Sequence, residues 1–144
     1  MEQRNQTLLV LHGAVVLFVG NLFGFPLGFA IADGASAEVV RAWQAAHSAV
    51  TAGGVMLIAI GAAAHYIALG PRAASWLVWS LMALGYGAIV GLGLGAAAGA
   101  RGFLPTGPAL NLIAFVGNLA VMSGSLVGIA LVIHGAYAAL RKAS

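Results

Sequence analysis

Apolar residues follow one another in four long runs along this chain, and short polar segments separate the runs. The runs cover residues 8–32, 42–69, 74–100 and 108–139. Each is longer than the ~20 residues that an α-helix needs to cross a bilayer. Lipid offers no hydrogen-bond partner to free backbone groups, so spans of this kind must be helical. The pattern therefore predicts an all-α protein with four transmembrane helices.

The segments between the runs predict how the helices are arranged. All three are short, and the longest joins the first two runs at residues 33–41. Short connections make consecutive helices antiparallel neighbours. We therefore expect residues 1–144 to form a single transmembrane domain, an up-down four-helix bundle.

Composition supports a membrane protein and excludes several other classes. The chain is 62% hydrophobic and 6% charged, whereas a soluble domain carries about 25% charged residues. The few basic residues form no stripe of the kind that binds nucleic acid. The chain has no cysteine, which excludes disulfides, thiolate metal sites, iron–sulfur clusters and a cysteine nucleophile.

The positive charges are divided unevenly between the two ends of the predicted helices. One side carries Arg4, Arg72, Arg141 and Lys142, and the other carries Arg41 and Arg101. Lys and Arg concentrate on the cytoplasmic side of membrane proteins. We therefore expect both termini in the cytoplasm and the protein to be a multi-pass protein of the inner membrane.

The third predicted helix carries a row of glycines. Gly87, Gly91, Gly95 and Gly99 follow one another at intervals of four residues, which places them on one helix face. Such a face allows a second helix to approach closely. The partner helix could belong to the same bundle or to a second subunit, and the sequence leaves both interpretations open.

The histidines divide into two groups by their expected depth in the membrane. His12, His65 and His134 lie near the cytoplasmic ends of their helices, while His47 stands alone near the outer end of the second helix. An ionisable residue in a membrane span is costly and usually functional. His47 is therefore the first candidate for a site, although a histidine that only forms a hydrogen bond between helices is the alternative.

A single histidine limits the cofactors that His47 can bind. Zinc and non-haem iron sites need three or more protein ligands, and the outer half offers one histidine. Haem needs only one or two axial ligands, because the porphyrin supplies four nitrogens. His47 is thus a candidate ligand of haem b, with Arg41 and Arg101 as candidate partners of the haem propionates.

Three polar residues lie nearer the middle of the predicted spans. They are Asn21, Tyr86 and Asn118. Their side chains can form hydrogen bonds at a depth where few others can. They are our candidates for orienting a substrate.

Three segments resemble a family of small four-helix membrane isomerases that includes styrene oxide isomerase and hydroxylaminobenzene mutase. Residues 41–61 read RAWQAAHSAVTAGGVMLIAIG and resemble the second helix of styrene oxide isomerase. Residues 11–25 read LHGAVVLFVGNLFGF and resemble the start of the mutases. Residues 101–111 read RGFLPTGPALN and resemble the isomerase loop. Together they span most of the chain.

The resemblance implies a function. It implies that His47 ligates haem b, that ferric haem acts as a Lewis acid, and that the protein is a homotrimer with haem near subunit boundaries. The expected substrates are small and hydrophobic: an aryl epoxide that becomes an aldehyde, or an aryl hydroxylamine that becomes an aminophenol. The chain departs from styrene oxide isomerase at Gly53, where that enzyme has asparagine. The third helix also lacks its aspartate, and Tyr86 does not align with its tyrosine.

Two other functions remain open at the level of sequence. A membrane electron carrier would hold haem between two of the inner histidines, His12, His65 and His134. A small membrane protein without a cofactor would use none of them.

Overall fold

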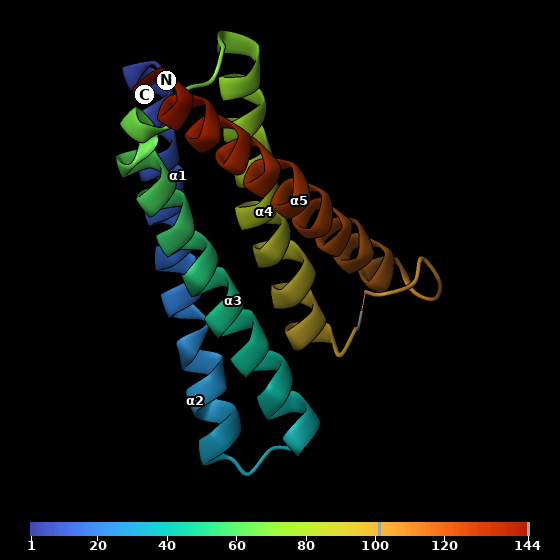
Figure 1. The fold of residues 1–144 in the computed structure, drawn as a ribbon. Helices are drawn as coiled ribbons and strands as arrows, with labels where there is room; N and C mark the ends of the chain where they lie inside the picture. The colour runs from blue at the N-terminus through green and yellow to red at the C-terminus, as the bar shows by residue number, and fades with distance from the viewer. Residues whose placement is uncertain (101, 144) are drawn as a thin grey trace.

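The computed structural model describes residues 1–100 and 102–143, and these residues contain helices and no strand (Figure 1). The first span consists of α1 (Gln3–Leu22) and α2 (Gly24–Ala32). The second is α3 (Ala37–Ala62), followed by the 3-10 turn η1 (Ala64–Tyr66). α4 (Pro71–Ala98) and α5 (Ala109–Ala143) complete the fold. All four spans are long and apolar enough to cross a membrane, which confirms the all-α, four-helix prediction.

The spans run up and down, and both termini lie at the same end of the molecule (Figure 1). α1 and α3 lie side by side along most of their length, and α4 packs against both of them. α5 packs mainly against α4 and diverges from α3 toward the opposite end. The compartment that the termini face stays a prediction.

The first span is one apolar run in the sequence but two helices in the structure. Pro26 has no backbone N–H, and a proline ring clashes with the carbonyl four residues earlier. That carbonyl belongs to Leu22, where α1 ends. α2 then begins at Gly24, so the break falls at Phe23.

The bounds of α3 differ from those expected at both ends. It begins at Ala37 because Ser36 caps it: the Ser36 hydroxyl accepts a hydrogen bond from the Val39 N–H at 3.4 Å. It ends at Ala62, before the expected residue 69. The chain then becomes extended at Ile67, and the Ala68 N–H donates to the Gly135 carbonyl at 3.0 Å. The apolar residues after Ala62 therefore leave the helix and form a segment that is hydrogen-bonded to α5.

Glycines allow the closest approaches between helices. A Cβ atom on Gly20 of α1 would lie 2.6 Å from the Thr51 nitrogen of α3. A Cβ atom on Gly117 of α5 would lie 2.5 Å from the Gly91 nitrogen of α4. Of the predicted glycine row, Gly87 and Gly91 therefore pack against α5 within the same chain, whereas Gly99, with φ +64°, ends α4.

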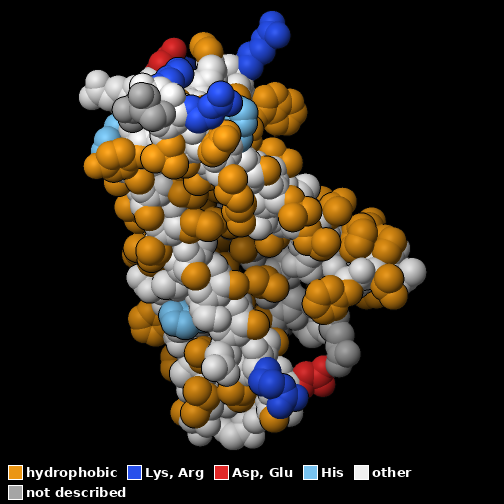
Figure 2. All heavy atoms as spheres, in the orientation of Figure 1, with side chains coloured by type: hydrophobic (Ala, Val, Ile, Leu, Met, Phe, Trp, Pro, Cys, Tyr) orange, Lys and Arg blue, Asp and Glu red, His pale blue; other side chains and the backbone are white. Residues whose placement is uncertain are grey.

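The molecular surface has the character of a membrane protein. Figure 2 shows hydrophobic side chains over the flank of the molecule and Lys and Arg side chains at its two ends. Large apolar residues are exposed along the spans, among them Phe18 on α1 and Leu126 on α5. Exposed apolar surface of this extent is typical of contact with lipid or another subunit.

Candidate functional site

His47 lies on the side of α3 that faces the first span, and its ring is fixed by one hydrogen bond. Its Nδ1 atom is 2.8 Å from the carbonyl oxygen of Gly20. A carbonyl can only accept, so Nδ1 carries the proton and donates it. In the neutral imidazole, Nε2 then holds the free lone pair. This is the arrangement that metal-binding histidines use, with the second nitrogen bonded to a carbonyl or carboxylate.

The break in the first span builds the surroundings of His47. Gly24, just after the break, lies beside the ring, where a Cβ atom would be 3.5 Å from Cε1. Phe23, at the break, contacts the Trp43 ring edge to face, with ring centroids 5.7 Å apart. A Cβ atom on Gly93 of α4 would lie 2.6 Å from Phe23 Cζ. Phe23 thus locks the first span against α3 and α4 close to the His47 ring.

His47 is half-buried and lies deeper than its place in the sequence suggested. Because α3 begins at Ala37, the histidine is ten residues, or about 15 Å, from the start of the helix. Thr51 lies one turn further along, and its buried hydroxyl has no hydrogen-bond partner among the described residues. The intermediate burial of His47 means that part of the residue reaches the surface of the molecule.

Of the two arginines expected near His47, Arg41 is among the described residues and Arg101 is not. Arg41 is exposed on α3. Six residues separate it from His47, which corresponds to about 120° around the helix axis and about 9 Å along it. Arg101 lies outside the described residues. The pairing of either arginine with a propionate stays a prediction.

Multi-ligand metal sites find no support in the described part of the chain. Residues 1–100 and 102–143 hold no group of three or more His, Cys, Asp or Glu side chains that could share a metal ion. Haem iron needs only one or two protein ligands, so the lack of such a group does not bear on haem, and haem binding by His47 stays a prediction.

The three mid-depth candidates do not form one site. The Asn118 amide donates to the Gly102 carbonyl at 3.1 Å and thereby holds the α4–α5 loop against α5. Asn21 is exposed on α1 beside Gly20. The Tyr86 hydroxyl lies 2.7 Å from His12 Nδ1. Each residue therefore has separate surroundings, and their substrate-orienting role stays a prediction.

The pairing of His12 with Tyr86 was not foreseen from the sequence. We expected His12 near the end of its helix together with His65 and His134, but α1 begins at Gln3 and His12 lies deeper. Gly13, the residue after His12, packs against Ile58 of α3. Ile58 precedes His65 by seven residues, or about 10 Å along the helix, so His12 lies deeper in the bundle than His65. His65 is exposed in η1, with Nδ1 3.1 Å from the Ala62 carbonyl, and His134 is exposed on α5.

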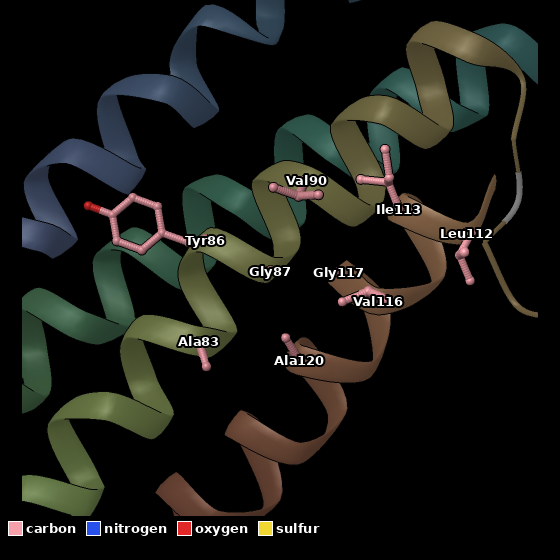
Figure 3. A pocket seen from close by; sticks show the side chains of 9 residues that line it. All are labelled: Ala83, Tyr86, Gly87, Val90, Leu112, Ile113, Val116, Gly117 and Ala120. Carbon is pink, nitrogen blue, oxygen red and sulfur yellow. The ribbon is translucent and has the colours of Figure 1, made fainter. Parts of the chain in front are cut away.

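Several cavities lie beside α4, including one next to α5 and one next to α3. One of about 520 Å³ lies between α4 and α5 (Figure 3). Its walls are apolar, and the Tyr86 hydroxyl points away from the other lining side chains, toward α1. The second, of about 410 Å³, lies between the first half of α3 and the end of α4. Both could accept a hydrophobic molecule of modest size.

Comparison with known proteins identifies the family. The family model of styrene oxide isomerase matches residues 5–137. No curated protein and no solved structure matches the chain. The matched region includes all four spans, His47 and the break at Phe23. This membrane-spanning chain therefore belongs to the styrene oxide isomerase family.

Proposed function

We propose that this protein is a membrane isomerase that binds ferric haem b through Nε2 of His47. The hydrogen bond from His47 Nδ1 to the Gly20 carbonyl carries the proposal, because it leaves Nε2 free to coordinate iron. The family supports an isomerase acting on a small molecule. The match to the family does not specify the haem or the particular reaction, and both are part of the proposal.

The bound haem would supply a Lewis acid that polarises a C–O or N–O bond of the substrate. The chain itself contributes the axial imidazole and its orientation. Because Nδ1–H donates to a carbonyl, His47 becomes a more electron-rich ligand. Arg41 and Arg101 remain the proposed partners of the propionates.

The proposed substrates are an aryl epoxide, which would become an aldehyde, or an aryl hydroxylamine, which would become an aminophenol. Either is apolar enough to arrive through the lipid, and the half-exposed His47 is reachable from that side. Gly53 replaces the asparagine of styrene oxide isomerase and faces the interior, where a Cβ atom would lie 3.5 Å from Leu84. An epoxide would therefore be oriented by other groups, and Asn21, Tyr86 and Asn118 are proposed for this.

The proposed assembly is a homotrimer in the inner membrane with both termini in the cytoplasm. Polar side chains at membrane depth support contact between subunits. Gln44 and Ser48 are exposed on α3 near His47, and polar groups in membrane spans usually face protein rather than lipid.

Replacement of His47 tests the haem site. We expect His47→Ala to remove the Soret absorption of the purified protein while its helix content and elution volume stay unchanged. His65→Ala is the matched control, because His65 is exposed in η1 and bonds only to its own helix end; it should retain haem. Full haem binding by His47→Ala would overturn the assignment.

A further inference from the structure

A second polar site lies at mid-membrane, apart from His47. The rings of His12 on α1 and Tyr86 on α4 pack edge to face, with centroids 5.7 Å apart. The Tyr86 hydroxyl oxygen is 2.7 Å from Nδ1 of His12. Both side chains are half-buried. The described residues offer no further hydrogen bond to either side chain.

The donors of this pair cannot all be satisfied by the pair itself. If the Tyr86 O–H donates to Nδ1, the proton of the neutral imidazole is on Nε2, and this N–H has no partner. If Nδ1–H donates to the Tyr86 oxygen, the Tyr86 O–H has no partner. Either tautomer therefore leaves one donor free. An unsatisfied donor in hydrocarbon is costly, so a ligand with an acceptor atom would be bound favourably.

The depth of the pair limits what that ligand can be. Tyr86 lies fifteen residues after Pro71 and twelve before Ala98, or about 22 Å and 18 Å from the two ends of α4. The hydrocarbon core is about 30 Å thick, so the pair is close to its middle. Ester and phosphate oxygens of lipids lie at the interfaces, beyond reach. An acceptor at this depth must belong to a molecule that dissolves in the membrane interior.

We propose that the His12–Tyr86 pair binds the oxygen of a small aromatic molecule in the membrane interior. The pair donates one hydrogen bond to that oxygen, and the two aromatic rings offer an apolar surface for the body of the ligand. His12 and Gly20 are eight residues apart on α1, about 12 Å along the helix. The pair is therefore a docking site separate from His47, where a substrate stops on its way from the lipid.

The identity of the ligand rests on the proposed function, since aryl epoxides and aryl hydroxylamines are aromatic molecules with an oxygen acceptor. Binding itself can be measured without haem or turnover. The probe is acetophenone labelled with ¹³C at its carbonyl, whose stretching band moves to lower frequency when the oxygen accepts a hydrogen bond. The protein is the full chain in lipid nanodiscs, in a His47→Ala background so that iron cannot bind the ketone.

We expect a saturable, hydrogen-bonded carbonyl band in this protein. Adding His12→Phe and Tyr86→Phe together should remove the band. Each single change should retain it, because the remaining residue still has a donor. A His65→Phe change is the control and should have no effect. In the protein with intact His47, the double change should raise KM for an aryl epoxide about tenfold, the equivalent of one hydrogen bond.

Two results would overturn the docking site. One is the absence of a saturable band in the His47→Ala protein with its pair intact, as expected if a trapped water satisfies the donor. The other is that either single change removes the band as completely as the double change, as expected if the pair only holds α1 against α4. Circular dichroism and elution volume verify that the double variant is folded. Loss of haem binding through His47 would leave these outcomes unaffected, so the two proposals fail independently.

Discussion

His47 and His12 both use Nδ1 for one hydrogen bond, but their partners have different consequences. The Gly20 carbonyl can only accept, so it fixes the tautomer of His47 and leaves a lone pair on Nε2. The Tyr86 hydroxyl can donate or accept, so it fixes neither tautomer of His12. The first histidine therefore has a free lone pair on Nε2, and the second belongs to a pair with one free hydrogen-bond donor.

The hydrogen bond of His47 depends on the close approach of two helices at Gly20. In Gly20→Ala, the new Cβ atom would lie 2.6 Å from the Thr51 nitrogen, so α1 must move away and the carbonyl must leave Nδ1. We expect the ¹⁵N NMR signals of His47 in haem-free protein to change from one tautomer to a mixture. Haem affinity should fall about tenfold, the range seen when such partners of a ligand are lost.

Gly24→Ala is the matched control for this change. Its Cβ atom would be 3.5 Å from the His47 ring, an ordinary contact, so the tautomer should stay single. A single, unchanged tautomer in Gly20→Ala as well would show that the carbonyl does not orient His47.

At the residue scale, the sequence indicated His47 as a candidate, and its role as a ligand stays a prediction. The sequence singled out His47 because an imidazole in a membrane span is costly, and the structure gives that residue a free Nε2. The partner on Gly20 was not predictable, since it depends on the register between α1 and α3. The same limit applies to His12 and Tyr86, which are 74 positions apart.

At the scale of elements, the apolar runs predicted the number of helices better than their bounds. Composition alone cannot distinguish a straight helix from one that Pro26 breaks, or a helix end from the extended segment that follows η1. The break has a structural consequence, because it brings Phe23 against Trp43 and Gly24 beside His47.

The glycine row of α4 gives a prediction at the same scale. A Cβ atom on Gly91 would overlap the Asn118 side chain of α5. Gly91→Leu should force the two helices apart and lower the melting temperature by at least about 5 °C, as expected for an overpacked core. The measurement is thermal unfolding followed by circular dichroism in detergent.

The control for Gly91 is Gly28→Leu on α2, where nothing lies within 4 Å of the new Cβ atom. It should melt within about 2 °C of the parent protein, the shift of a small surface effect. If Gly91→Leu melts like this control, the α4–α5 contact does not depend on glycine.

At the scale of the whole molecule, the two proposed histidine sites lie at different depths of the same bundle. Hydrophobic side chains cover the flank (Figure 2), so an aromatic substrate can enter from the lipid at any height. The His12–Tyr86 pair lies close to the middle of the membrane. Gly20, whose carbonyl bonds to His47, lies about 12 Å further along α1, away from the termini. An apolar substrate would therefore need no aqueous channel between them.

The proposed reaction also predicts how the whole protein behaves toward redox reagents. An epoxide and its aldehyde, or a hydroxylamine and its aminophenol, are isomers with the same atoms and electrons, so turnover consumes no reductant. Ferric, haem-loaded protein incubated with an aryl epoxide or an aryl hydroxylamine should form the rearranged product with no added electron donor, as measured by chromatography. His47→Ala, treated identically, should form product only at the uncatalysed rate. A strict requirement for a donor would contradict the isomerase and favour an electron carrier. Such a carrier would hold haem between His65 and His134, because the Ala68 N–H donates to the carbonyl of Gly135, the residue after His134, whereas His12 lies about 10 Å deeper than His65.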